Sequence, residues 1–533
     1  MKSSVKHIDL LDYVRGIAIL SVLFFHTLGT TFGFDSLPWD GLQRDFSVPN
    51  SFLIFLPLSF GQIGVPIFFV ISGFCIHLSC RQQDQKWSGF FIRRFFRIWP
   101  PYFVAIIFSA LLLMAHSGFD LCNVAVWRAW LTHLFLVHNF DSINFHTVNG
   151  SFWSLAIEVQ LYLIYPVLLF FVGKIGWRRV MTILAIGEFL IRASDGVIQT
   201  LGASNTAWGT ASEILSNSPL GYWFSWSLGA FIADALLKNQ PLPFSKTISM
   251  PWIFLLIISY FFKPLYSFFF LLAAIATAIF ISQLLSGNAP KLKVPAVALA
   301  TLKKIGLWSY SIYLLHQPLI NIYSDFISAT IPQQHRSAFL MFALELLTWS
   351  VVILFGVLWY KLFELPSIAI GKRILQKRDA RNASMFEPQR TQEVHKISRS
   401  TFCAMIGAFL IIAIGSCLVS AKFTPDPPEK NNNLAWAFAT NPDPAKRNGA
   451  LAVKLAEDAC NRTQYRTTAM VGTLAASYAE VGRFDDAVAA AQRAIMLATQ
   501  NGETNLLQKN QELLTFYLNH QPYRESPTNS PAK

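Results

Sequence analysis

The sequence predicts an all-α, polytopic membrane protein with a small helical tail. Of its 533 residues, 53% are hydrophobic and only 14% are charged, whereas soluble domains average about 25% charged residues. Apolar runs long enough to cross a bilayer recur from residue 13 to residue 421. Because a bilayer offers no hydrogen bonds to an exposed backbone, such runs are expected to be helices. We expect about ten core spans and one further span near the C-terminus.

Charge and cysteine content exclude several other classes of protein. The net charge of +13 does not indicate nucleic-acid binding, because most basic residues lie in short loops between apolar runs, where they set orientation. The six cysteines are scattered, and none has metal-ligand spacing near histidines. We expect no metal site and no permanently bound cofactor. Asp9, Asp12 and Arg15 interrupt the first apolar run and no small-residue cleavage site follows, so we expect an uncleaved first span.

The basic loops give one consistent topology when they are placed in the cytoplasm. The expected core spans are 13–33, 60–79, 99–115, 152–172, 180–194, 219–237, 250–262, 265–285, 304–325 and 338–362. The aromatic segment 126–135 is short and is expected to lie along the outer membrane interface. The core domain, 1–370, then begins in the cytoplasm and ends before a basic cytoplasmic linker, 371–400. The additional span 401–421 carries the tail out of the cytoplasm.

The tail has a different composition from the membrane domain. A Pro/Asn-rich linker, 422–433, precedes an alanine-rich segment, 434–520, with helical patterning. Leu434–Ala439 is echoed by Leu474–Ala479, and Ala475–Ala487 resembles the tetratricopeptide pattern, in which small alanines let paired helices pack closely. Because so short a repeat array is marginal alone, we expect it to need either an extracytoplasmic protein partner or a capping helix, for which Leu506–Leu518 is the candidate.

The first span contains two ionisable residues on one helix face. Arg15 and His26 are eleven residues apart, which is three turns plus roughly 20°, and they are about 16 Å apart along the axis. Ionisable groups at such depths cost about 2.5–3.5 kcal/mol on insertion scales and usually face a partner, a cavity or a substrate path. This pair suggests chemistry within the membrane.

Two segments after the first span leave structural and chemical interpretations open. In Gly64–Phe74 the small residues favour close helix approach over a catalytic role. Arg94 and Arg97 share a helix face beside aromatic residues. They are either ordinary cytoplasmic charges that orient the chain or a cradle for phosphate groups.

Two later spans contain further polar residues. Glu158, in the segment Ser151–Tyr162, lies roughly two turns inside its span. It is expected either to pair with Arg15 as a structural contact or to support His26. His316, in the segment Gly306–Pro318, either hydrogen-bonds between helices or takes part in chemistry.

Together these segments resemble acyltransferase family 3, the O-antigen acetylase-like group of integral membrane proteins. That family's pattern is an Arg-Gly followed by a histidine eleven residues after the Arg, then Phe-Phe-x-x-Ser-Gly-Phe and Arg-x-x-Arg-Ile-x-Pro. It ends with Trp-Ser-Leu-x-x-Glu and Ser-Tyr-x-x-Tyr-Leu-x-His-x-Pro. All five motifs occur here in order, and the resemblance covers about residues 8–365. One departure is slight: Val159 and Gln160 follow Glu158, where many members have a second acid.

The resemblance implies transfer of an acyl group, usually acetyl, from cytoplasmic acyl-CoA to a hydroxyl of a cell-surface or secreted carbohydrate. It implies a multi-pass protein of the bacterial cytoplasmic (inner) membrane, in contact with the lipid bilayer. His26 would be catalytic, as general base or as acyl carrier, with Arg15 and Glu158 beside it. Arg94 and Arg97 would hold the phosphates of the acyl-CoA. The supporting residues would be Trp153, Ser154, Tyr310 and His316.

Two other functions compete with the enzyme. A transporter or flippase of a lipid-linked sugar would use Arg15, Glu158 and His26 as a relay, but residues 1–370 contain no convincing internal repeat of the kind such folds show. A membrane-anchored docking protein would act through the helical-repeat tail. The enzyme is the function that we favour.

The topology can be checked with a protease added outside the membrane. We expect it to cleave the tail, because 401–421 is expected to carry the tail out of the cytoplasm. Immunoblotting of intact spheroplasts against a C-terminal epitope measures this. Full protection of the epitope would invert the topology.

Overall fold

The computed structural model describes residues 9–32, 59–82, 87–117, 124–141, 145–201, 206–289, 294–331, 338–385, 428–463, 465–501 and 503–525. Every regular element in these ranges is a helix, which confirms the all-α fold class. The chain divides into two compact units, Met1–Lys422 and Phe423–Lys533. Six of the described helices are long and apolar enough to cross a membrane, and two more are apolar but shorter.

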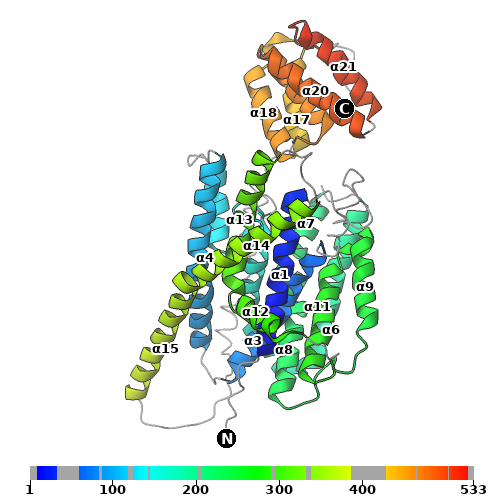
Figure 1. Ribbon diagram of the computed structural model, residues 1–533. Helices are drawn as coiled ribbons and strands as arrows, with labels where there is room; N and C mark the ends of the chain where they lie inside the picture. Colours follow the sequence, from blue (N-terminus) through cyan, green and yellow to red (C-terminus); the bar gives the residue numbers. More distant parts are fainter. Residues whose placement is uncertain are drawn as a thin grey trace. The chain divides into compact units, whose positions relative to one another are not determined.

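The first unit is a bundle in which most helices run in broadly the same direction or its opposite, whereas α14 and α15 cross them obliquely (Figure 1). Its α-helices are α1 (Asp9–Phe32), α3 (Gly64–Gln82), α4 (Trp87–Ser117), α5 (Val124–Leu134), α6 (Phe152–Thr200), α7 (Ala207–Ser216), α8 (Trp223–Leu237), α9 (Met250–Phe261), α10 (Lys263–Tyr266), α11 (Phe269–Leu285), α12 (Ala296–Leu307), α13 (Ser309–Thr330), α14 (Ala338–Trp359) and α15 (Leu365–Met385).

Several of these helices differ from the predicted spans at their ends. The spans expected at 152–172 and 180–194 form one long element, α6, which breaks at Gly176 with φ +80°. Only glycine adopts that backbone conformation without strain, so a single residue replaces the expected loop. The span expected at 304–325 divides at Trp308 into α12 and α13.

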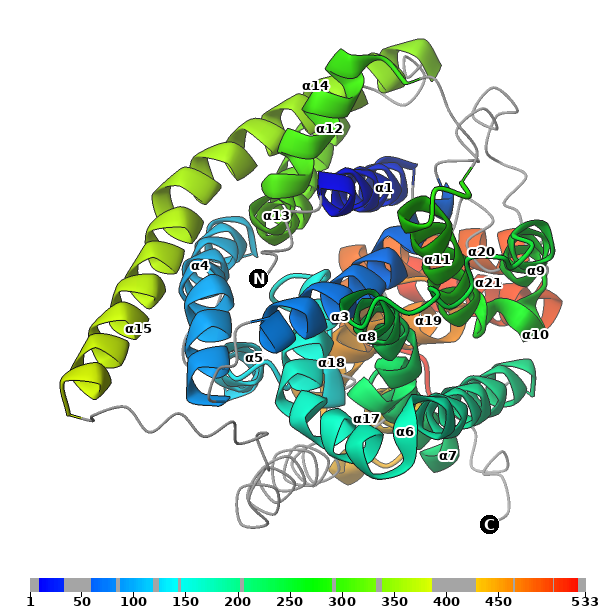
Figure 2. The same ribbon diagram turned by 90° about the horizontal axis from the view of Figure 1, so that it is seen from below.

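The C-terminal part of the first unit is more helical than predicted. A π-helical turn, Tyr360–Glu364, joins α14 to α15, so the basic residues from 372 to 378 lie on a helix. This helix lies at the edge of the unit, against α4 (Figure 2). The expected span 401–421 and the linker residues after 385 lie outside the described residues, and the span count stays a prediction.

Close backbone contacts between α3 and α8 determine the centre of the bundle. The two helices lie side by side between α1 and α6 (Figure 2). A Cβ atom on Gly73 would lie 2.0 Å from the Trp226 carbonyl oxygen, and one on Gly229 would lie 1.8 Å from that of Val70. Small residues at both positions therefore let the helices touch along their backbones, as is usual within membranes.

A buried polar group ties α3 to α6 and α8 at one end. His77 Nε2 lies 3.2 Å from Asp234 Oδ1, and its Nδ1 lies 3.1 Å from the Tyr165 hydroxyl. Lys238 Nζ donates to the other oxygen of Asp234 at 2.6 Å. Because every member has a partner, the group joins three helices without leaving a buried charge unpaired.

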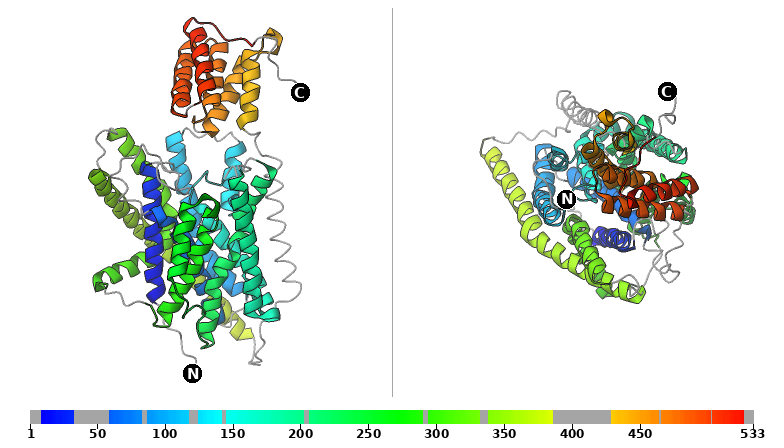
Figure 3. Two further views of the ribbon diagram at one scale, coloured as in Figure 1. Left: turned by 90° about the vertical axis from the view of Figure 1, so that its right-hand side faces the viewer. Right: turned by 90° about the horizontal axis from the view of Figure 1, so that it is seen from above.

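The described residues of the second unit form five α-helices, which lie side by side (Figure 3), and a short 3-10 helix, Pro444–Lys446. The α-helices are α17 (Pro428–Thr440), α18 (Gly449–Arg462), α19 (Thr468–Glu480), α20 (Phe484–Asn501) and α21 (Thr504–Leu518). Each helix packs against the next, largely through buried alanines such as Ala452, Ala475 and Ala491. The first of them begins inside the segment expected to be a linker, 422–433. The tetratricopeptide assignment stays a prediction.

The α3–α8 contact predicts that Gly229→Ala destabilises the membrane unit. The added methyl group overlaps the Val70 carbonyl, and overpacking of this kind costs about 1–3 kcal/mol. Thermal unfolding of the detergent-purified protein measures the loss as a lower midpoint. Gly187→Ala on α6 is the matched control, since a Cβ there meets nothing within 4 Å. Equal midpoints for the two variants would contradict the close contact.

Candidate functional site

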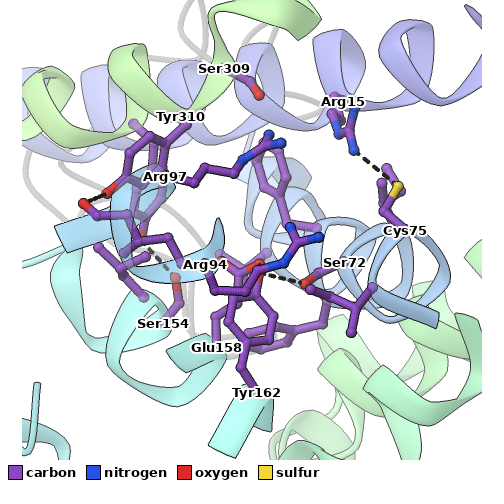
Figure 4. A pocket seen from close by; sticks show the side chains of 18 residues that line it. Arg15, Ser72, Cys75, Arg94, Arg97, Ser154, Glu158, Tyr162, Ser309 and Tyr310 are labelled. Carbon is purple, nitrogen blue, oxygen red and sulfur yellow. Dashed lines mark hydrogen bonds between the residues drawn. The ribbon is translucent and has the colours of Figure 1, made fainter. Parts of the chain in front are cut away.

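A cavity of about 110 Å³ lies inside the first unit, between α1, α3, α4, α6 and α13 (Figure 4). Each of the five sequence motifs contributes to its lining, although Arg15 and Tyr313 are almost 300 residues apart. The polar lining residues are Arg15, Ser72, Cys75, Arg94, Arg97, Ser154, Glu158, Tyr162, Ser309, Tyr310 and Tyr313. The fold thus brings together residues that the sequence distributes over five helices.

Arg15 is held by the close packing of α1 against α12. A Cβ on Gly16 would lie 2.3 Å from the Leu302 carbonyl oxygen, and one on Gly306 would lie 1.9 Å from that of Asp12. The Arg15 guanidinium donates to Asp12 Oδ1 at 2.8 Å and to Cys75 Sγ at 3.0 Å. Its position is therefore determined by a carboxylate one turn earlier and by a neighbouring helix.

Arg94 and Arg97 reach the cavity from α4. Arg94 donates to Ser79 Oγ at 2.8 Å and lies over the Phe90 ring. Arg97 makes no hydrogen bond or ion pair with the described residues, and its guanidinium lies between Ser309 and Arg94 in the cavity (Figure 4). The donors of Arg97 are thus available to a ligand.

Glu158 is the only carboxylate among the residues that line the described cavity, and a tyrosine holds it. The Tyr162 hydroxyl, one helical turn later, donates to Glu158 Oε1. That hydroxyl also lies 3.0 Å from Ser72 Oγ, which in turn accepts from Trp226 Nε1 at 3.2 Å. Glu158 therefore has a partner different from Arg15 and His26, the two considered from sequence. Three arginines face one carboxylate, which makes the cavity suited to an anion.

His26 lies about three turns along α1 from Arg15 and does not line the cavity. Its Nδ1 lies 2.9 Å from the Val22 carbonyl oxygen, and a carbonyl only accepts, so this nitrogen is the donor. In the neutral ring, Nε2 therefore keeps its lone pair. The ring contacts His316 edge-on, with centroids 4.8 Å apart. The structure thus pairs the two histidines that the sequence placed in the first and a late span.

Tyr313 connects the histidine pair with the cavity. Its ring lines the cavity and its centroid lies 5.3 Å from that of His316. Ser154 Oγ and the Tyr313 hydroxyl are 2.7 Å apart, and that hydroxyl donates to the Ser151 carbonyl oxygen. The two regions are therefore joined by direct contacts between α6 and α13.

The remaining predicted supporting residues have distinct positions. Tyr310 lines the cavity, and its hydroxyl donates to the Ile98 carbonyl oxygen at 2.7 Å, which ties α13 to α4. Trp153 does not line it and packs against Phe145 and Phe270. Of the nine residues predicted from sequence, six line the cavity, two form the histidine pair and Trp153 does neither.

Some residues that complete the site were not predicted from the sequence. Asp12 precedes Arg15 by three residues and Tyr162 follows Glu158 by four, so each shares a helix face with its partner and could have been found. Ser72 belongs to the second motif, for which the sequence favoured a packing role, and Cys75 approaches through tertiary packing, for which local spacing gives no signal. No group of three metal-ligating side chains occurs in the described ranges.

A family model described as an acyltransferase domain matches residues 8–363. The peptidoglycan O-acetyltransferase OatA of Listeria monocytogenes is 27% identical over 358 residues, which are 62% of this chain and 52% of that protein. The putative peptidoglycan O-acetyltransferase YrhL of Bacillus subtilis is 23% identical over 477 residues, or 83% of this chain and 67% of its own. Acyltransferase MdmB of Streptomyces mycarofaciens is 31% identical over 121 residues, covering 22% and 31% of the two chains.

These similarities cover only part of this chain and of its relatives. The chain spans about half the length of several of the curated relatives that it matches. No solved structure matches it. The family match ends before the second unit begins.

Proposed function

Because the chain belongs to acyltransferase family 3, whose domain model covers residues 8–363, we propose that it is an integral membrane O-acetyltransferase. The donor is acetyl-CoA from the cytoplasm, and the acceptor is a hydroxyl of a cell-surface or secreted carbohydrate. The observation that carries this proposal is a single cationic cavity that side chains of all five motifs line. Tyr313, one of the lining residues, contacts His316, and His316 contacts His26.

The chemistry of the cavity supports binding of the CoA phosphates. Arg15, Arg94 and Arg97 face a single carboxylate, Glu158. Guanidinium groups bind phosphate through two parallel hydrogen bonds, and such charge-assisted bonds are among the strongest in proteins. Arg97 has donors that no described residue uses, so it is the arginine best suited to bind phosphate directly.

The geometry of His26 supports a role in the transfer step. A thioester is already activated, so the remaining requirement is removal of a proton from the attacking hydroxyl. Neutral imidazole is basic in the right range, and the Val22 carbonyl leaves Nε2 of His26 as the nitrogen with a lone pair. The same nitrogen could attack the thioester and carry the acetyl group. Both chemistries need His26 neutral with Nε2 exposed to the reactants.

The names of the relatives support a carbohydrate acceptor outside the cytoplasm. OatA and YrhL are named for peptidoglycan O-acetylation. We place the chain in the bacterial cytoplasmic membrane, with its N-terminus in the cytoplasm and its tail outside. The tail would there bind a protein partner through a tetratricopeptide-like surface formed by α17–α21.

Loss of the His26 imidazole is expected to abolish transfer. His26→Ala removes the imidazole that we propose as the base, which is the α1 side chain in contact with His316. The rate of acetyl transfer should therefore fall about 10²- to 10⁴-fold. Inside-out vesicles supplied with acetyl-CoA labelled on the acetyl group, with a glycan acceptor present, measure the transfer. His520→Ala, a histidine of the second unit, is the control. A variant at His26 as active as this control would exclude the assigned role.

Loss of the Arg97 charge is expected to weaken donor binding. Because charged hydrogen bonds contribute about 1.5–3 kcal/mol, Arg97→Gln should raise the KM for acetyl-CoA about 10- to 100-fold with a smaller effect on kcat. Arg178→Gln, an exposed arginine on α6 that does not line the cavity, is the matched control. Equal KM values for both variants would mean that Arg97 only orients the chain.

A further inference from the structure

The first residue of α13, Ser309, carries a hydroxyl group without a partner among the described residues. Its side chain lines the cavity and is only 6% exposed. A serine inside a helix commonly donates to the carbonyl four residues earlier, as Ser21 does to Ile17. Ser309 follows the break at Trp308, and the Ile305 carbonyl four residues earlier accepts from the Trp308 amide at 3.2 Å. The Ser309 hydroxyl is therefore left as a donor for a ligand in the cavity.

The start of α13 also favours negative charge. Ser309 and Tyr310, its first two residues, line the cavity, so this end of a 22-residue helix faces the enclosed space. Backbone N–H groups in the first turn of a helix have no partner within that helix, and the helix dipole attracts anions there. Another side of the same turn holds a carboxylate: Ser311 Oγ donates to Glu364 Oε2 at 2.7 Å, and Glu364 does not line the cavity. The cavity side of the turn remains for an anion from outside the chain.

Arginine side chains surround the same part of the cavity. The Ser309 hydroxyl and the guanidinium groups of Arg97 and Arg15 all point into it (Figure 4). A phosphate oxygen placed there would accept charge-assisted hydrogen bonds, which are about twice as strong as neutral ones. Whole small-molecule ligands occupy pockets of about 300–1,000 Å³. A cavity of about 110 Å³ therefore holds a part of CoA and not the whole molecule.

The length of CoA indicates which of its phosphates lies in the cavity. Arg15 and His26 are about 16 Å apart along α1. The pantetheine arm has about thirteen bonds from phosphorus to sulfur, as many as just over four residues, so it spans about 15 Å when extended. A diphosphate beside Arg15 therefore lets the thioester reach His26. If the 3′-phosphate lay there instead, the charged diphosphate would move toward the apolar stretch Gly16–Phe25, where burial of charge is costly.

We propose that Ser309 and the N-terminus of α13, together with Arg97, bind the diphosphate of the CoA donor. This inference rests on the proposed function, which supplies that donor. Ser309 Oγ donates to a phosphate oxygen outside the P–O–P bridge, and the Arg97 guanidinium donates to its neighbour. The diphosphate is thereby fixed at the point where the pantetheine arm begins, so the arm extends along α1 toward His26.

The first test compares Ser309→Ala with wild type in inside-out vesicles supplied with labelled acetyl-CoA and a glycan acceptor. We expect the KM for acetyl-CoA to rise about tenfold with little change in kcat, because one charge-assisted hydrogen bond is lost. Ser282→Ala is the matched control: Ser282 on α11 is buried, its hydroxyl also has no partner in the described part of the chain, and it does not line the cavity. Equal KM values for the two variants would overturn the inference.

The second test identifies the phosphate with shortened donors. Acetyl-3′-dephospho-CoA keeps the diphosphate and lacks the 3′-phosphate, whereas acetyl-pantetheine lacks every phosphate. The loss of kcat/KM in Ser309→Ala should be about tenfold for acetyl-CoA and for acetyl-3′-dephospho-CoA, and it should disappear for acetyl-pantetheine. A loss that is already absent with acetyl-3′-dephospho-CoA would assign Ser309 to the 3′-phosphate. A loss that persists with acetyl-pantetheine would mean that Ser309 acts only through packing, and either result overturns the diphosphate site.

Binding of labelled ADP separates this inference from the proposed function. ADP carries a diphosphate but no acetyl group, so its binding to the purified protein in nanodiscs requires no transfer. We expect Ser309→Ala to raise the Kd for ADP about tenfold relative to Ser282→Ala. If wild type transfers label but the two variants have equal KM and Kd values, the inference fails and the proposed function stands. If ADP binding depends on Ser309 but wild type transfers no label, the proposed function fails while the diphosphate site itself stands.

Discussion

The membrane unit depends on enclosing charged side chains within an apolar helical bundle. Guanidinium and carboxylate groups in such a bundle need partners or a polar cavity. Direct backbone contacts at Gly16 and Gly306 hold α1 against α12, and those at Gly73 and Gly229 hold α3 against α8. Two of the helices that line the cavity, α1 and α3, are therefore held in place by neighbours outside it, and its charged lining is stabilised by residues such as Asp12, Ser79 and Tyr162.

The same packing connects two regions with different chemistry. The arginine cavity is suited to an anion, whereas the neighbouring region holds two imidazoles, His26 and His316, in edge-on contact. Tyr313 belongs to both, because its ring lines the cavity and its backbone and hydroxyl hold the network around His316. A ligand in the cavity would thus contact Tyr313, the residue whose carbonyl orients His316.

Much of the fold and site could be predicted because both depend on local spacing. Apolar run length predicted an all-α membrane protein, and six of the described helices are long and apolar enough to cross a membrane, while the count of ten core spans stays a prediction. Eleven-residue spacing predicted that Arg15 and His26 share a face of the first helix. The break at Gly176 and the helical continuation through Tyr360–Glu364 were missed, since neither alters the apolar pattern that defines a span. The partners of Glu158 and Arg15 were not anticipated, because two helix-face neighbours, Tyr162 and Asp12, were overlooked. The contribution of Cys75, which lies outside the five motifs, arises from tertiary packing alone.

The central claim is that the cavity between α1, α4 and α6 holds the acyl donor and directs it toward the histidine pair. A cryo-electron microscopy structure of the protein in nanodiscs with CoA tests this most directly. The account predicts CoA phosphate density within hydrogen-bonding distance of Arg97 and either Arg94 or Arg15, with the thiol arm extending along α1 toward His26. Nucleotide density elsewhere, or an arm that leads away from His26, would contradict it.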